Sequence, residues 1–406
     1  MVDNASHVIV GADPLLQSAT GIGTYTRNLV KYLKSERLTA DLKLFANGIF
    51  LSDGVLSDLD QWETKLSSLS NSKNSGNQSQ FADLMLTLRS KVSQSRMALQ
   101  LFNKVVPLIE EARLRPFRDY IFHSPNYLLP RFSGATVVTI HDLSIQRYPE
   151  YHPSKRVEFL EAKIAAAAQG ATHLITDSVC VREEIIGYFG LDESRVTTVP
   201  LAAAEQFKYR TEIECRQVLK SLRLGYKSFF LFASTIEPRK NLLRICAAYK
   251  SLRAARKTDW PIIFVGGRGW RSEAEHQEIR SLVDRGWAQY LGFVDSATLP
   301  ILYSAAAALV FPSIYEGFGL PALEAQQSGT RVITSRGSAM AEFSGEHDLL
   351  IEPLEVDSLI EAMEAVIELV LADNCQPLQC AGSGLSWQKT ARLTAEVYQK
   401  VLLART

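Results

Sequence analysis

Residues 311–329 read FPSIYEGFGLPALEAQQSG and predict a strand, a glycine-rich turn and a helix in direct succession. The strand, 308–311, is a short apolar run of the kind that is buried on both faces of a sheet. The two glycines of the turn free the backbone of Cβ hindrance. Pro321 suits the first helical position, and Gly329 ends the helix. A strand followed closely by a helix is the building unit of a parallel α/β sheet.

The same unit recurs along the chain. Short apolar runs rich in β-branched residues predict strands at 7–10, 120–123, 136–140, 173–176, 196–199, 229–233, 262–265, 308–311 and 331–334. Stretches with helical spacing lie between most of them, among them 155–169, 242–254 and 357–371. This alternation indicates parallel sheets wrapped by helices.

Two domains are expected, because 406 residues exceed what one hydrophobic core usually supports. One series of predicted strands closes at Val199 and a new series opens beyond it. We therefore predict two doubly wound α/β domains, residues 1–206 and 207–386. Residues 387–406 predict an amphipathic helix that packs back on the body of the protein.

The composition excludes several classes of protein. The formal net charge is +0, so nothing global attracts nucleic acid, and 46% hydrophobic residues rule out a disordered chain. Five cysteines without a CxxC pair argue against a disulfide framework or a zinc site and favour a reducing compartment. No basic, apolar leader opens the sequence, and no apolar stretch reaches roughly eighteen residues. We expect a cytoplasmic protein that is neither secreted through a cleaved signal nor membrane-spanning.

Two segments of the first domain stand apart from the strand–helix pattern. Residues 66–80 are rich in Ser and Asn, which favours a mobile loop. In residues 89–118 cations outnumber carboxylates and apolar residues recur between them, as on a helix that rests on an anionic membrane. We favour the alternative, a helix packed on the core with a solvated cationic face.

The glycine-rich turn also indicates chemistry. At the start of a helix the amides of Phe318, Gly319 and Leu320 lack intrahelical partners, and such amides favour an anion, usually a phosphate. We place Glu316 in the turn and Glu324 in the first helical turn, where each carboxylate can accept two hydroxyls of a sugar or ribose ring. One glutamate would be explained by the helix dipole alone. Two around one turn indicate a binding site.

A cationic turn follows the strand at 229–233. Pro238 stiffens this turn and delivers Arg239 and Lys240 to the next helix, where their charges would neutralise a diphosphate. Open α/β sheets bind ligands beyond the carboxyl ends of their strands, which favours a functional role over surface decoration. Gly267 lies in a glycine turn after the strand at 262–265 and repeats the arrangement.

In the first half, Gly21 and Gly23 form a Gly-x-Gly turn before a helix that we predict at 25–33. Such a turn suits a phosphate. It is not a dinucleotide-binding fingerprint, because Thr26 stands where the third glycine would be and about ten residues separate the strand from Gly21. A dehydrogenase is therefore the least favoured enzyme class.

His141 and Asp142 place an imidazole and a carboxylate at the end of the strand at 136–140. His141 could guide an acceptor hydroxyl or hydrogen-bond a sugar, with Asp142 as a general base. A lone histidine is more often structural, and we expect that of His123 and His173. The position of His141 at a strand end favours function.

Together these motifs resemble the retaining glycosyltransferases of family 4, which have the GT-B fold. The match covers most of the chain. Its most specific part, EGFGLPALE at 316–324, looks like the E-x7-E element of that family. Also similar are the Gly21-Ile22-Gly23 turn, the His141-Asp142 strand end, the Glu237-Pro238-Arg239-Lys240-Asn241 turn, and Gly292-Phe293-Val294 before a helix start at 299–303.

By that resemblance, two Rossmann-like domains face each other across a cleft, the second binds a nucleotide-sugar, and the last helix crosses back to the first. Many relatives carry an arginine six residues before the lysine, where this chain has Ser234, so Arg239 is expected to share that duty. The resemblance implies that Lys240 holds the diphosphate, with the Gly21 to Gly23 turn closing over it. Glu316 and the amides of Phe318 to Leu320 would hold the donor sugar and phosphate. Glu324 would bind the ribose, and Phe293 and Val294 would bind the base.

The expected chemistry is stabilisation of a diphosphate leaving group by cations and amides, with no metal or other cofactor. Retention is implied by the family alone. The triplet Asp58-Leu59-Asp60 looks like a metal-binding D-x-D, but its polar context has no strand, and we attribute it to chance.

Two other functions stay open: a nucleotide-sugar 2-epimerase, which would need no acceptor, and a noncatalytic nucleotide-sugar-binding partner. The sequences of residues 236–241 and 141–144 resemble those of bacterial mannosyltransferases of polysaccharide assembly. This resemblance favours GDP-mannose as the donor over UDP-glucose, UDP-N-acetylglucosamine or dTDP-rhamnose. The acceptor is expected to be a saccharide or a lipid-linked saccharide. A lipid-linked acceptor would bring residues 89–118 to the inner face of the plasma membrane. The sequence does not indicate an oligomeric state.

Overall fold

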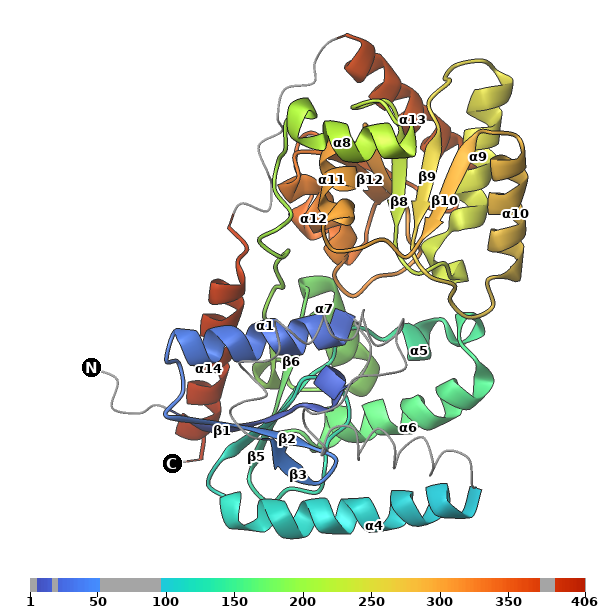
Figure 1. Ribbon diagram of the computed structural model, residues 1–406. Coiled ribbons are helices and arrows are strands. Elements are labelled where there is room, and N and C mark those ends of the chain that lie inside the picture. Colours follow the sequence, from blue (N-terminus) through green and yellow to red (C-terminus); the bar gives the residue numbers. More distant parts are fainter. Residues whose placement is uncertain (1–5, 17–20, 52–95, 373–383, 406) are drawn as a thin grey trace, which may run out of the picture.

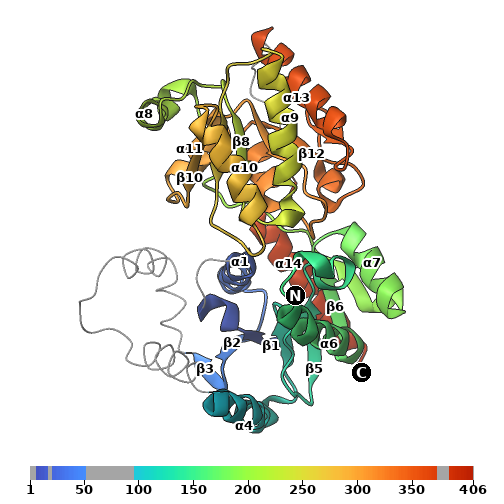
Figure 2. The ribbon, with the colours of Figure 1, turned by 90° about the vertical axis from the view of Figure 1, so that its right-hand side faces the viewer.

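A computed structural model describes residues 6–16, 21–51, 96–372 and 384–405. These residues form two α/β bodies, each built on a largely parallel sheet, and Figure 1 shows the second body above the first. In the view turned by 90° the two sheets remain separate and the last helix passes below the second body (Figure 2). The predicted loop at 66–80 lies outside the described residues.

The first sheet contains seven strands among the described residues, in the order β3-β2-β1-β4-β5-β6-β7. All neighbours are parallel except the β2–β3 pair. Its strands are β1 (His7–Gly11), β2 (Asp41–Ala46), β3 (Ile49–Leu51), β4 (Ile121–Ser124), β5 (Ala135–Thr139), β6 (His173–Thr176) and β7 (Val196–Thr198). Its helices are α1 (Gly21–Ser35), α4 (Arg96–Leu114), α5 (Ser144–Arg147), α6 (Ser154–Gly170) and α7 (Val179–Phe189).

The second sheet has six described strands, all parallel, in the order β10-β9-β8-β11-β12-β13. They are β8 (Phe230–Ala233), β9 (Ile262–Val265), β10 (Ala288–Gly292), β11 (Ala308–Phe311), β12 (Arg331–Ser335) and β13 (Leu349–Ile351). The helices around it are α8 (Glu212–Leu222), α9 (Leu242–Ala254), α10 (Glu273–Asp284), α11 (Thr298–Ala305), α12 (Leu320–Gln327) and α13 (Val356–Leu371). Strands β8, β9 and β11 are buried throughout, which explains their unbroken apolar sequences.

Helix α14 (Trp387–Leu403) returns from the second body and packs along α1 (Figure 1). Thr390 donates a hydrogen bond to the carbonyl of Pro200 at 2.7 Å, and Arg392 pairs with Glu36 at 2.6 Å. The hydroxyl of Tyr398 lies 2.6 Å from Nδ1 of His123 inside the first body. The end of the chain is thus part of the first core. The domain boundary at 206/207 stays a prediction.

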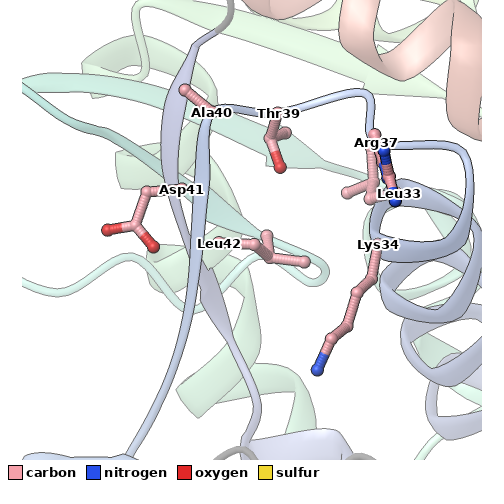
Figure 3. A pocket seen from close by; sticks show the side chains of 7 residues that line it. All are labelled: Leu33, Lys34, Arg37, Thr39, Ala40, Asp41 and Leu42. Carbon is pink, nitrogen blue, oxygen red and sulfur yellow. The ribbon is translucent and has the colours of Figure 1, made fainter.

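A pocket lies between the last turn of α1 and the start of β2 (Figure 3). Its walls include Leu33, Arg37 and Asp41. Because β2 begins at Asp41, this pocket is at the amino end of the sheet, whereas open α/β sheets bind their ligands beyond the carboxyl ends. We assign it no part in the site described next.

Candidate functional site

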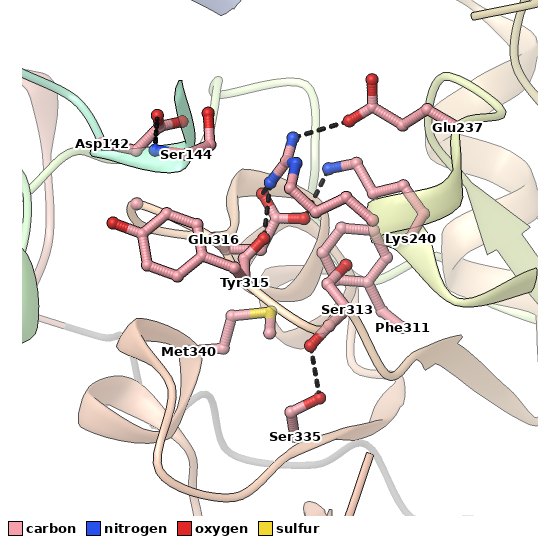
Figure 4. Close-up of polar contacts among 12 residues, drawn as sticks. Asp142, Ser144, Glu237, Lys240, Phe311, Ser313, Tyr315, Glu316, Ser335 and Met340 are labelled. Atoms are coloured by element: carbon pink, nitrogen blue, oxygen red, sulfur yellow. Dashed lines mark hydrogen bonds and ion pairs between the residues drawn. The ribbon is translucent and has the colours of Figure 1, made fainter. Parts of the chain in front are cut away.

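The centre of the candidate site is an ion pair between two neighbouring strands of the second sheet. Lys240 ends the short 3-10 helix Pro238–Lys240 after β8, and Glu316 lies in the turn after β11. Since β8 and β11 are adjacent and parallel, their carboxyl ends bring both side chains to one edge. Nζ of Lys240 is 2.5 Å from Oε1 of Glu316, and both residues are buried (Figure 4).

Arg239 extends this pair into a network. Its Nη1 lies 3.0 Å from Oε2 of Glu316, and its Nη2 lies 2.7 Å from Oε1 of Glu237. Nη1 also donates to the carbonyl of Tyr315. The planar fork of a guanidinium suits this double contact, which an ammonium cannot reproduce.

The network fixes the charge of Glu316. Burial by itself would raise the pKa of Glu316, but Arg239 and Lys240 outweigh burial and lower it to about 2. Burial lowers the pKa of Lys240 in spite of the nearby carboxylate. Glu316 is therefore ionised at neutral pH. A diphosphate at this place would have to share the ammonium of Lys240, because Glu316 contacts it here.

The glycine turn has the predicted shape. Gly319 has φ +102°, a conformation that favours glycine, and its carbonyl accepts the first bonds of α12 from Ala322 and Leu323. The amides of Phe318, Gly319 and Leu320 thus precede the first intrahelical hydrogen bond, as an anion site requires. The ring of Phe318 is buried against that of Phe343, with centroids 5.0 Å apart.

Two details of α12 differ from the prediction. The helix begins at Leu320, so Pro321 is its second residue, and Glu324 lies in the second turn instead of the first. The half-buried carboxyl of Glu324 hydrogen-bonds Tyr303 on α11, and burial raises the pKa of Glu324 to about 8. Glu324 is therefore not part of the Glu316 network.

His141 is fully engaged by protein groups. Its Nδ1 lies 2.6 Å from Oδ2 of Asp177, and its Nε2 lies 3.0 Å from the carbonyl oxygen of Pro125. Burial opposes protonation, but Asp177 and the Pro125 carbonyl outweigh it and raise the pKa of His141. Both ring nitrogens are thus within hydrogen-bond distance of an oxygen atom, and Nδ1 shares a proton with the Asp177 carboxyl. The ring has no free nitrogen to guide an acceptor hydroxyl, contrary to our expectation.

The Asp142 side chain makes fewer hydrogen bonds than that of His141. Its Oδ1 accepts the amide of Ser144 at 2.9 Å, and among the described residues its other carboxylate oxygen has no hydrogen-bond partner. Figure 4 shows Asp142 and Ser144 of the first body facing the Glu316 network of the second. Asp142 remains the candidate base.

The two bodies meet closely at this place. A Cβ on Gly317 would lie 1.9 Å from the carbonyl oxygen of His141, so only glycine fits there. Ser178 donates to the carbonyl of Gly317 at 2.8 Å. The hydroxyl of Tyr315 accepts the amide of Leu143 at 3.0 Å and donates to a carboxylate oxygen of Glu184 at 2.6 Å. The site is therefore made of strand ends from both sheets.

The remaining predicted residues lie at the edges of this site. Gly21 and Gly23 belong to the first turn of α1, which begins four residues earlier than predicted. One turn later, the Tyr25 ring lies 4.9 Å from that of His141. Gly267 is exposed after β9. Beyond the neighbouring strand β10, Phe293 is 84% exposed and Val294 is partly buried.

Sequence reasoning assigned no role to several residues that build the site: Glu237, Tyr315, Asp177, Ser178 and Glu184. Asp177 and Ser178 directly follow β6, so the strand-end argument that found His141 would also have found them. Tyr315 and Glu184 come together only through the contact between the bodies, which no local pattern encodes.

No group of three His, Cys, Asp or Glu that could hold a metal ion occurs in the part of the chain that the structure describes. The Asp58-Leu59-Asp60 triplet lies outside that part. The metal-free chemistry expected from the sequence stays a prediction.

Known proteins with similar sequences are glycosyltransferases. The family model for glycosyl transferases group 1 matches residues 219–375. The O-antigen chain mannosyltransferase B of Escherichia coli is 33% identical over 398 residues, which cover 97% of this chain and 99% of the relative. The chain belongs to the glycosyl transferases group 1 family. The family predicted from the motifs is thereby confirmed.

Other relatives match over shorter spans. The serotype-specific mannosyltransferase WbdA of Escherichia coli is 28% identical over 66% of this chain and 34% of its own length.

Solved structures support the GT-B fold. A glycosyltransferase from Rickettsia africae has a TM-score of 0.65 at 15% identity, covering 98% of this chain and 99% of that one. Anabaena HepE, in complex with UDP and glucose, has a TM-score of 0.64 at 15% identity, covering 97% and 100%. The predicted fold of two facing parallel-sheet domains is confirmed.

Proposed function

We propose that this group 1 glycosyltransferase is a mannosyltransferase that moves a mannosyl group, with retention, from GDP-mannose to a saccharide or lipid-linked saccharide acceptor. The supporting observation is the buried Glu316 beside Lys240 and Arg239, at a turn whose amides precede the first hydrogen bond of α12. The choice of mannose rests on the full-length match to an O-antigen mannosyltransferase.

The second domain stabilises the leaving group. Cleavage of the bond between the anomeric carbon and the phosphate builds negative charge on GDP, and cations and amides fixed beforehand stabilise it. Lys240 and Arg239 supply the cations, and the amides of Phe318 to Leu320 supply the dipoles. No step requires a metal or other cofactor.

The other donor contacts follow from the strand ends. Glu316 accepts hydroxyls of the mannosyl group, and Glu324 accepts those of the ribose. The base lies near Phe293 and Val294, and Gly267 and the Gly21 to Gly23 turn let the backbone approach the phosphates. His141 is held by Asp177 and the Pro125 carbonyl and positions the strand end, and Asp142 or the departing phosphate takes the acceptor proton.

A panel of nucleotide-sugars in a thermal-shift assay tests the donor. GDP-mannose should raise the melting temperature more than UDP-glucose, UDP-N-acetylglucosamine or dTDP-rhamnose. Turnover is then followed as acceptor-dependent release of GDP, and the one-bond carbon–proton coupling at the anomeric centre of the product reports retention. Release of GDP without an acceptor would indicate an epimerase or a hydrolase instead.

Lys240→Met separates catalysis from binding. Loss of one preorganised charge at a leaving group typically lowers kcat by ~10²–10³. The protein should stay folded, since Arg239 still pairs with Glu316. If Lys240→Met weakens GDP-mannose binding and no turnover is found in the wild type, the protein is a noncatalytic binding partner.

A further inference from the structure

His152 has an unusual environment for a buried histidine. It is only 4% exposed, yet neither Nδ1 nor Nε2 has a hydrogen-bond partner in the part of the chain that the structure describes. A buried polar group without a partner costs ~1–3 kcal/mol, and in native proteins such groups commonly await a ligand or an ordered water. Hence both nitrogens of His152 keep unused hydrogen-bonding capacity among the described residues.

The surroundings of His152 come from both domains. It follows the 3-10 helix Pro149–Tyr151 of the first domain, and its ring lies 5.7 Å from that of Trp270, in the loop after β9 of the second. The guanidinium of Arg156 lies 4.8 Å from the Trp270 ring. Next to them, Arg271 donates to the carbonyl of Glu150 and ties the two segments together.

This cluster borders the catalytic centre. Burial lowers the pKa of His152, the carboxylate of Asp142 opposes that effect, and Arg239 and Arg156 add to it. The imidazole is therefore neutral at pH 7 and close enough to Asp142 and Arg239 to feel their charges. A neutral imidazole can donate through one nitrogen and accept through the other.

We propose that His152, Trp270 and Arg156 form a subsite for the acceptor saccharide, in which His152 hydrogen-bonds a sugar hydroxyl. This inference rests on the proposed function. Neighbouring aromatic and guanidinium groups suit a sugar ring, which presents an apolar C–H face to the one and hydroxyls to the other. Apart from the Gly21 to Gly23 turn, the proposed donor contacts follow strands of the second sheet, whereas His152 and Arg156 belong to the first domain, as expected for the opposite substrate.

The test uses His152→Phe, which keeps an aromatic ring against Trp270 and removes both nitrogens. With GDP-mannose and octyl α-D-mannopyranoside as the acceptor probe, KM for the probe should rise about tenfold, while KM for GDP-mannose stays unchanged. The melting temperature should not fall, because no hydrogen bond within the protein is lost. Trp270→Leu should also raise KM for the probe.

His173→Phe is the matched control. His173 is also 4% exposed, but it begins β6 at the amino end of the sheet, and its Nε2 lies 2.8 Å from the hydroxyl oxygen of Thr197. This variant should lose thermal stability and keep the acceptor KM, the reverse of His152→Phe. An unchanged probe KM in His152→Phe would overturn the subsite.

A second measurement does not need turnover. Saturation-transfer NMR on the GDP-loaded wild-type protein should detect the octyl mannoside, and the signal should weaken in His152→Phe. No transfer in the wild type would overturn the subsite while leaving the proposed function intact if GDP-mannose binds. Failure of GDP-mannose to bind would instead refute the proposed function.

Discussion

Arg239 joins two carboxylates that no other described cation connects. Its terminal nitrogens contact Glu316 at 3.0 Å and Glu237 at 2.7 Å. Arg239→Lys keeps the charge but reaches only one of them, so kcat/KM for the donor should fall by about 10–100-fold, in the range of a lost charged hydrogen bond. Arg268→Lys, at an exposed pair with Glu273, is the control and should change little. Equal kinetics of the two variants would contradict the bridging role.

Glu324 predicts a pH dependence of stability. Its pKa is about 8 in the folded protein against 4.5 for an ordinary glutamate, so between these values the unfolded chain releases a proton that the folded chain keeps. Its contribution to stability is full below pH 4.5 and falls as pH rises towards 8, with a slope approaching ~1.4 kcal/mol per pH unit. Glu324→Gln should remove this slope in denaturant unfolding measured from pH 5 to 8.5. If the unfolding free energies of the wild type and Glu324→Gln changed with pH in the same way, the role of Glu324 would be refuted.

The residues of the site differed in how well the sequence revealed them. Glu316 and Lys240 follow neighbouring parallel strands of one sheet, whose carboxyl ends lie at one edge, so the proximity of these two residues could be predicted. Asp142 follows a strand of the other sheet, and its position near them depends on how the two domains meet. The hydrogen bonds of His141 could not be predicted, because the proximity of its partners, Asp177 and the Pro125 carbonyl, depends on the order of the strands in the sheet. His152 was missed for a similar reason, since Trp270 comes from the other domain.

At the level of elements, the sequence predicted β1, β4 to β9, β11 and β12 within one residue at either end and missed β2, β3, β10 and β13. The physical reason is their length and burial. Strands β2 and β10 are only partly buried and polar residues interrupt their sequences. Strands β3 and β13 are apolar but only three residues long, which is too short for a recognisable buried strand.

The turn between β11 and α12 predicts a strict requirement for glycine. Gly317→Ala would put a methyl group 1.9 Å from the His141 carbonyl, which is backbone and cannot move aside without separating the domains. We expect a loss of transferase activity of at least about 10²-fold, as for a misplaced catalytic group, with both domains still folded. Circular dichroism and initial rates are the measurements.

Gly187→Ala in α7 is the control for that substitution. A Cβ at Gly187 meets nothing within 4 Å, so alanine should stabilise the helix by ~0.5–1 kcal/mol and leave activity unchanged. Full activity in Gly317→Ala would mean that the two domains do not meet at this turn during catalysis.

At the scale of the whole molecule, α4 displays an amphipathic outer surface. Val105, Leu108 and Ile109 are 41%, 58% and 43% exposed, although Leu114 at its end is buried in the core. The described helix thus has a buried end and exposed apolar side chains, and contact of residues 89–118 with a membrane stays a prediction. No described helix is long and apolar enough to cross a membrane.

Three exposed arginines, Arg113, Arg115 and Arg118, border that surface. Each cation near an anionic leaflet contributes ~1 kcal/mol of membrane binding. Replacing all three with Gln should reduce activity on acceptors embedded in anionic vesicles and spare soluble acceptors. The same exchange at Arg216 and Lys220 of α8 should affect neither. Equal losses on both kinds of acceptor would refute membrane contact.

The closed arrangement of the two domains depends on a few polar contacts, and one of them can be removed without touching the site. Glu342 of the second domain accepts the amides of Val179 and Cys180, the first two of α7 in the first domain, at 2.9 and 2.6 Å. A carboxylate at a helix N-terminus contributes ~1 kcal/mol, which corresponds to about a fivefold shift of an open–closed equilibrium.

Glu342→Ala should therefore favour the open form. Because closure excludes water from the donor, the ratio of GDP-mannose hydrolysis to transfer should rise by about the same fivefold factor. Small-angle scattering should show a larger radius of gyration for the variant. Glu346→Ala removes a nearby exposed carboxylate that has no hydrogen-bond partner among the described residues, so it should match the wild type in both measurements. If Glu342→Ala also matches the wild type, other contacts such as the Ser178–Gly317 hydrogen bond hold the domains together.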